Sequence, residues 1–131
     1  MKKEQKPLKM IGNSCYLQKI TKTMIIYNVT THIEETIKEE WLEWMKSEHI
    51  PQVLATGKFK GAKLTRVLVE EEKGGLTYSI QYRALSRQAL DEYYEVFAMQ
   101  LRNEGLKRFA DKMLAFRTEL EIIDEYTVDF N

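Results

Sequence analysis

A histidine close to two tryptophans is the first candidate for chemistry. His49 follows Trp41 and Trp44 in a stretch with helical spacing, and Pro51 comes two residues later. A histidine ring exchanges protons near neutral pH, so His49 is a candidate acid, base or ligand. Near the end of a helix, the helix dipole favours the protonated ring. The alternative is a surface histidine that only makes a capping hydrogen bond at the helix end. His49 is thus the candidate catalytic residue, and Trp44 is a candidate for ligand contact as well as for the core.

Three polar residues form the second candidate group. Asn28, Gln81 and Arg117 each alternate with apolar neighbours in a predicted strand. We expect them on the face of the sheet that the helices leave open, where they would hold the polar groups of a ligand. The alternative is that such polar residues satisfy one another across neighbouring strands and bind nothing.

The motifs that mark metal, nucleotide and redox sites do not occur in the chain. His32 is followed by Glu34 and Glu35, but no HExxH pattern is formed, and Cys15 is the single cysteine. A glycine-rich phosphate loop, a nucleophile elbow and a CxxC pair are also missing. We therefore predict no metal and no cofactor.

Composition limits the class of protein. The 131 residues suit one domain, and 20 basic against 20 acidic residues leave no net charge to attract nucleic acid. Hydrophobic residues make up 44% of the chain, but their runs are far shorter than the roughly 20 residues that cross a bilayer. Because a lone cysteine forms no internal disulfide, we expect a cytoplasmic protein. The zero net charge and the short apolar runs further predict that it binds neither nucleic acid nor membrane.

The first 23 residues differ from the rest. They carry six lysines and one glutamate without a sustained helical or strand period, which predicts a flexible basic extension. The extension is a solvated tail, a basic arm for nucleic acid, or the product of a start codon placed too early, with Met24 as the true beginning. The folded domain is expected over residues 24–126, with a C-terminal tail at 127–131.

Periodicity within the domain predicts four strands and two helices. The strands are expected at 24–31, 62–72, 76–85 and 113–123, the middle two joined through Lys73, Gly74 and Gly75. The first helix begins with a capping box at Thr31 or Thr36 and ends at Pro51, before a short turn closed by Gly57. Ser86 caps the second helix, which ends near Gly105.

The resulting order predicts an α+β, ferredoxin-like βαββαβ fold, a four-stranded antiparallel sheet with two helices on one face. Apolar alternation assigns to the helix side Ile25, Tyr27, Val29, Tyr78, Ile80, Tyr82, Leu114, Phe116 and Leu120. The predicted strand at 62–72 has apolar residues on both faces, since alternation places Leu64 and Leu68 on one face and Val67 and Val69 on the other.

The open face of the sheet is then solvated, binds RNA, or packs on the same face of a second copy. RNA-recognition motifs share the strand order but place stacking aromatics on the open face, whereas Tyr27, Tyr78 and Tyr82 are expected under the helices. This placement argues against RNA. A symmetric dimer would explain Ile26 on the open face and the apolar second strand.

Four segments carry a family resemblance. MIIYNVT, EEWLEWMKSEHIPQVLATGKF, GLTYSIQY and LAFRTELE together resemble the bacterial domain of unknown function 4286 family over residues 24–125, and residues 1–23 have no counterpart. More remotely, the chain is similar to the dimeric α/β-barrel superfamily. That similarity implies ferredoxin-like subunits paired through their sheets, in a group that includes monooxygenases, haem-degrading enzymes and isomerases.

The haem chemistry of that superfamily does not carry over. Its haem-degrading members use an asparagine on the first strand together with a tryptophan and a histidine. Asn28 matches the asparagine, but the second helix of this chain contains no histidine.

The expected function is therefore coarse. We predict a homodimer, joined through its sheets, that encloses a pocket in which a small organic ligand is bound or transformed without a metal. The alternative is a non-catalytic interaction module that docks a larger partner through its sheet face or its basic tail. An enclosed pocket lined by Asn28 and Arg117 would favour the first.

Overall fold

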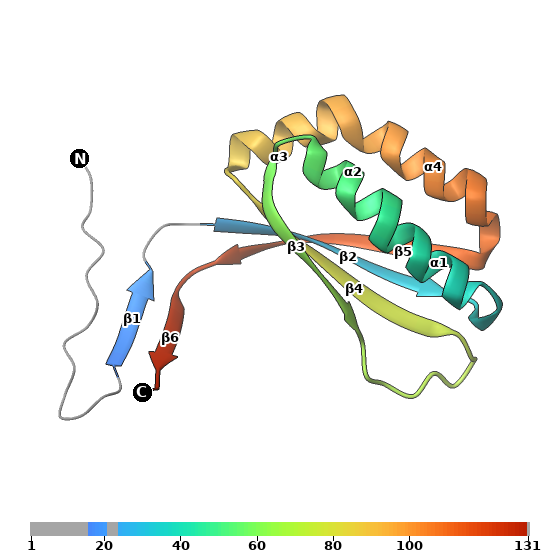
Figure 1. Cartoon of the computed structure of the whole chain (residues 1–131), viewed down its shortest axis with the longest axis horizontal. Coiled ribbons are helices and arrows are strands. Elements are labelled where there is room, and N and C mark those ends of the chain that lie inside the picture. The colour runs from blue at the N-terminus through green and yellow to red at the C-terminus, as the bar shows by residue number, and fades with distance from the viewer. Residues whose placement is uncertain (1–15, 21–23, 131) are drawn as a thin grey trace.

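The computed structural model describes residues 16–20 and 24–130, and its main body is one sheet with helices on one face (Figure 1). The sheet is antiparallel and has the strand order β3-β4-β2-β5. Its strands are β2 (Met24–Ile33), β3 (Phe59–Arg66), β4 (Leu76–Ala84) and β5 (Met113–Ile122). The α+β, ferredoxin-like βαββαβ prediction is confirmed.

The first helical run continues through the proline that was predicted to end it. A short 3₁₀ turn (Glu35–Ile37) leads into α1 (Lys38–Trp44), a π-helical turn (Met45–His49) and α2 (Ile50–Ala55). Proline lacks an N–H, and its ring crowds the carbonyl four residues earlier in a regular helix. The π turn ends at His49, two residues before Pro51, and widens the helix there, so the chain stays helical.

Both ends of this run differ in detail from the prediction. Neither predicted capping box forms, since no side chain caps the run and the Thr36 hydroxyl donates instead to the Glu34 carboxylate at 3.3 Å. Gly57 follows the helix with φ of +78°, as predicted for a closing glycine.

The second helical run comprises α3 (Arg87–Tyr93), a π-helical turn (Tyr94–Ala98) and α4 (Met99–Phe109). The predicted cap is confirmed, because the Ala89 N–H donates to the Ser86 hydroxyl at 3.0 Å. The predicted end at Gly105 is wrong. A Cβ at Gly105 would lie 3.3 Å from Trp44 Cη2, so this glycine lets the two helical runs approach closely rather than ending one of them.

The hairpin between β3 and β4 has a longer loop than predicted. β3 ends at Arg66, and Leu68 and Val69 are exposed in the loop that follows. The loop folds back because the Glu71 carboxylate accepts a hydrogen bond from the Thr77 hydroxyl at 2.7 Å. Gly74 and Gly75 take positive φ angles, as the sequence predicts for this turn.

The residues predicted to face the helices do so in β2 and β4, but the prediction is wrong for β5. Tyr27, Tyr78, Ile80 and Tyr82 are buried under the helices. In β5, however, Arg117 lies directly opposite Val29 of β2, and directly opposite residues in an antiparallel pair share a face. Arg117 therefore points to the helices, and the open face receives instead Leu114, Phe116 and Leu120.

A second, two-stranded sheet joins the two ends of the described chain (Figure 1). β1 (Tyr16–Ile20) pairs antiparallel with β6 (Glu125–Asp129), where the sequence predicts only an extension and a tail. The remainder of the predicted extension, at 1–15 and 21–23, lies outside the described residues. In the part of the chain that is described, no helix is long and apolar enough to span a membrane.

Candidate functional site

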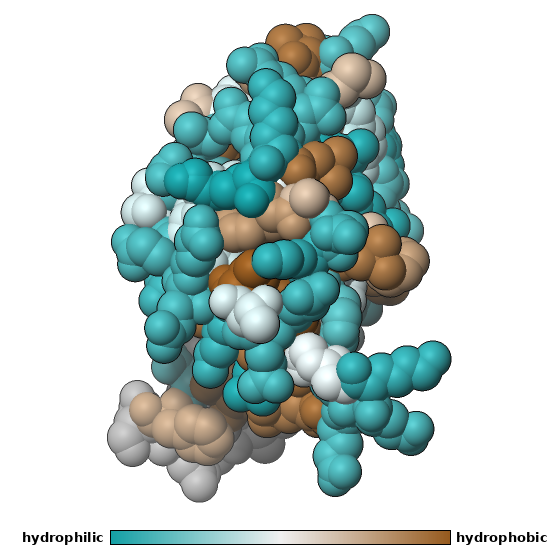
Figure 2. All heavy atoms as spheres, turned by 90° about the vertical axis from the view of Figure 1, so that its right-hand side faces the viewer, coloured by the Kyte–Doolittle hydropathy of each residue, from teal (hydrophilic) through white to brown (hydrophobic). Residues whose placement is uncertain are grey.

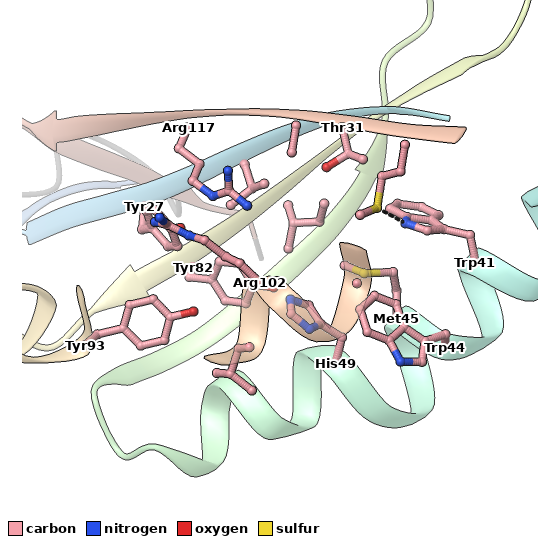
Figure 3. A pocket seen from close by; sticks show the side chains of 16 residues that line it. Tyr27, Thr31, Trp41, Trp44, Met45, His49, Tyr82, Tyr93, Arg102 and Arg117 are labelled. Carbon is pink, nitrogen blue, oxygen red and sulfur yellow. Dashed lines mark hydrogen bonds between the residues drawn. The ribbon is translucent and has the colours of Figure 1, made fainter. Parts of the chain in front are cut away.

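A small cavity lies between the helices and the sheet, with walls from β2, β4, β5 and both helical runs (Figure 3). Its volume is about 50 Å³, enough for water or a few ligand atoms. Hydrophobic side chains form most of the wall. The polar groups that line it are Tyr27, Thr31, His49, Tyr82, Tyr93, Arg102 and Arg117.

His49 reaches this cavity because the first helical run continues past it. Its ring stacks on Trp44, with centroids 4.7 Å apart and planes 24° from parallel. Burial first, and then the positive charge of Arg117, lowers the pKa of His49 to about 4. The ring is therefore neutral at pH 7. The expected protonation by a helix C-terminus is wrong, since the helix does not end at His49.

Two buried nitrogens in the pocket have no hydrogen-bond partner within the described part of the molecule. One is Nδ1 of His49 and the other is Nε of Arg102. Nη2 of Arg102 donates to the Tyr27 hydroxyl at 3.0 Å, which fixes the direction of the guanidinium. Buried polar groups in proteins almost always find partners, so these two nitrogens distinguish the cavity from the rest of the core.

Arg117 is the second arginine that lines the pocket. Its side chain points from β5 into the space between the sheet and the helices (Figure 3), and the residue as a whole is exposed. Two guanidinium groups from different elements, α4 and β5, thus meet at one cavity. Among the residues that the structure describes, no acidic side chain lines it.

Two buried tyrosines complete the polar lining. Burial is the main cause that raises the pKa of both Tyr82 and Tyr93 above the ordinary value of 10. Both hydroxyls therefore keep their protons at neutral pH and can donate hydrogen bonds.

Asn28 and Gln81 lie on the opposite, open face of the sheet, where they are paired across β2 and β4. The expected grouping with Arg117 is thus wrong. The Asn28 amide nitrogen donates to the Thr30 and Thr118 hydroxyls, both at 3.2 Å, and its oxygen accepts from Ser79 at 2.7 Å. This cross-strand network is the alternative that the sequence left open.

The structure thus brings together His49, Trp44 and Arg117 of the predicted site residues and adds Arg102. The position of Arg102 could have been found from its spacing in the sequence, although hydrophobic periodicity does not include charged residues. Tyr94, Ala98 and Arg102 follow each other at four-residue spacing, so the arginine continues a row that starts under the helix. A cation in such a row indicates a polar site within the core.

A second hollow is larger but chemically plainer. A groove of about 690 Å³ runs between the first helical run and β3, lined mainly by apolar side chains such as Ile50, Leu54 and Leu64. The end of the molecule at which α1 begins shows apolar patches separated by hydrophilic side chains (Figure 2). The groove has no buried polar atom left unpaired among the residues described, so the helix-covered pocket is the better candidate site.

The pocket offers no metal centre. Within residues 16–20 and 24–130, no group of three or more His, Cys, Asp or Glu side chains is arranged to hold a metal ion. The arrangement instead supplies fixed hydrogen-bond donors, two positive charges and one neutral imidazole, which suits the binding of a small polar or anionic molecule.

The four-stranded antiparallel sheet with two helical runs on one face defines the class as a ferredoxin-like α+β fold. The chain belongs to the DUF4286 family, a domain of unknown function, whose family model matches residues 24–123. No curated protein sequence matches the chain.

Solved structures support the fold at low sequence identity. A dimeric ferredoxin-like protein from an uncultured marine organism matches with a TM-score of 0.60 and 8% identity, over 78% of this chain and 97% of that one. A Bacteroides thetaiotaomicron protein of unknown function, named a possible oxidoreductase, has a TM-score of 0.57 and 14% identity, over 76% and 98%. An ethyl tert-butyl ether D (EthD) family protein from Bacillus halodurans has a TM-score of 0.55 and 12% identity, over 72% and 97%.

Proposed function

We propose that this protein binds a small organic ligand in the pocket between its helices and its sheet. The observation that carries the proposal is the pair of buried, unpartnered nitrogens, His49 Nδ1 and Arg102 Nε, on two residues that line one cavity. A buried polar group without a partner costs about 1–3 kcal/mol, and a ligand that pairs both nitrogens recovers that cost. The neutral His49 ring also gives the site a group that can exchange a hydrogen bond with a bound molecule.

A thermal-shift screen with a panel of small metabolites tests the binding. A compound present at 100 times its Kd is expected to stabilise the protein by about 2.7 kcal/mol. Ala115 lines the pocket, so Ala115→Leu fills part of the cavity and is expected to abolish the shift. The matched control is Ala55→Leu, a change at an exposed position of α2 that is expected to keep the shift. The proposal fails if no compound stabilises the protein, or if both variants respond alike.

We further propose that the protein forms a homodimer through the open face of its sheet. Leu114, Phe116 and Leu120 of β5 are exposed on that face, at 58%, 60% and 43% of their full accessible surface. Adjacent exposed apolar side chains mark association surfaces. The similarity to a dimeric ferredoxin-like protein supports a second copy as the partner. A larger protein in place of the second copy is the alternative.

Phe116→Glu is expected to convert the dimer to a monomer, because each copy would bury an unpaired carboxylate in an apolar contact. Light scattering after size-exclusion chromatography measures the mass of each variant. The control is Val96→Glu, which places the same charge at a similarly exposed apolar residue on the helix side, 64% exposed, and is expected to remain dimeric. A wild-type chain that is monomeric at high concentration would favour the interaction module instead.

A further inference from the structure

We infer that the ligand of this pocket carries a carboxylate, which the guanidinium groups of Arg102 and Arg117 bind together. This inference rests on the proposed ligand binding and names the chemical class of the ligand. It follows from the charge balance of the cavity, from the direction of Arg102 and from the nature of the remaining wall.

The charges at the cavity are unbalanced. Within the described residues, neither Arg102 nor Arg117 forms an ion pair, and no acidic side chain lines the pocket. Glu119 lies two residues after Arg117 on the same face of β5, but its carboxylate accepts hydrogen bonds from Arg87 at 2.7 Å and Tyr94 at 2.6 Å. Arg102 is half-buried, where a positive charge is costly without a counter-ion, so an anionic ligand is the group that the cavity lacks.

The geometry of Arg102 suits a carboxylate. Its Nη2 donates to the Tyr27 hydroxyl, while its Nε is buried without a hydrogen-bond partner in the described part of the chain. A guanidinium presents its N–H groups as a planar fork that matches the two oxygens of a carboxylate. Arg117 approaches the same space from β5 (Figure 3), so an anion there receives donors from two directions.

The rest of the wall limits the size and character of the ligand. Val29, Ile80 and Leu101 give the cavity apolar sides, which suit hydrocarbon. The volume of about 50 Å³ holds only a few non-hydrogen atoms inside. The unpaired Nδ1 of His49 adds one polar contact for a second functional group. A short-chain organic acid, with or without such a group, therefore fits the site better than a nucleotide or a sugar phosphate.

Matched acids and amides test the inference. Acetate, propionate and butyrate are compared with acetamide, propionamide and butyramide, which have nearly the same shape but no charge. Binding is followed by the NMR shifts of the Trp44 indole N–H and the Arg102 Nε–H at constant ionic strength. The acids are expected to shift both signals in a saturable manner, and the amides at least tenfold more weakly.

Three variants locate the charge that the acid needs. Arg102→Met and Arg117→Met are each expected to weaken the binding of propionate at least tenfold, as read from the Trp44 signal. Arg108→Met removes an equal charge from the exposed surface of the same helix as Arg102, where it lies 3.9 Å from Glu48, and is expected to leave binding unchanged. If Arg102→Met fails to fold by circular dichroism, Arg102→Lys keeps the charge, loses the fork and is expected to weaken binding severalfold.

Each outcome separates the two proposals. Acids and amides that shift the Trp44 signal equally would overturn the carboxylate inference but leave ligand binding intact. Inorganic phosphate that competes with propionate at equal concentration would overturn the preference for a carboxylate. If Arg108→Met weakens binding as much as Arg102→Met, the effect is bulk charge and the inference fails. If neither these probes nor any metabolite of the screen perturbs Trp44, the proposed function itself fails.

Discussion

Acidification from pH 7 to pH 4 is expected to lower the free energy of unfolding by about 2–3 kcal/mol through His49 alone. The pKa of its ring is lowered from 6.5 to about 4 in the folded protein. The unfolded chain therefore binds a proton near pH 6.5, while the folded chain resists it until about pH 4. The stability from this group is fully present above pH 6.5 and is lost as the pH falls through 4.

Denaturant unfolding of wild type and His49→Gln at intervals from pH 4 to pH 7 measures this effect. Glutamine is polar but does not titrate, so the difference between the two unfolding energies isolates the histidine. Carboxylates with lowered pKa values, such as Glu119 at about 2, titrate in both proteins and cancel. If the free energies of unfolding of the two proteins change in parallel with pH over the whole interval, His49 is solvated and does not lie in a buried pocket.

Much of the fold follows from apolar alternation and glycine chemistry. β2 and β4 are central strands, covered by helices on one side, and their apolar positions point there as alternation predicts. The hairpin glycines and the Ser86 cap follow from backbone requirements that few other residues meet. These features are local, so the sequence contains them.

The face of β5 could not be predicted in the same way. Leu114, Phe116 and Leu120 alternate as a core strand would, yet β5 is an edge strand and these side chains are exposed in the single chain. Burial between two copies leaves the same alternation as burial under a helix, and the sequence does not distinguish the two. Because the face of β5 was predicted wrongly, Arg117 was assigned to the open face, and the sequence did not predict that it lines the same cavity as Arg102.

The site depends on helix geometry that periodicity alone does not reveal. Proline ordinarily ends a helix, so His49 was predicted near a helix end. The π turn before Pro51 instead keeps the run helical, and the His49 ring stacks on Trp44 beside the cavity. π turns inside helices are frequent at functional sites, and this run places one directly at the candidate histidine.

Trp44→Ala is expected to lower the free energy of unfolding by about 3–5 kcal/mol and to raise the pKa of His49 towards 6.5. Trp44 is 5% exposed, meets Phe109 edge to face at 5.4 Å and stacks on His49. Its removal opens the pocket to water, and burial is the main cause of the low pKa of His49. Unfolding in urea and an NMR titration of the ring measure the two effects.

Trp41→Ala is the matched control for that result. Trp41 is fully buried, packs on Tyr78 at 5.0 Å and donates from Nε1 to the Met113 sulfur at 3.2 Å. Its loss is expected to cost a similar 3–5 kcal/mol, again about the value for a buried tryptophan. Trp41 lines the same cavity, but its ring packs on Tyr78 rather than on His49, so the pKa of His49 is expected to rise less than in Trp44→Ala. Equal changes of that pKa in both variants would mean that general loosening, rather than the Trp44 stack, controls the imidazole.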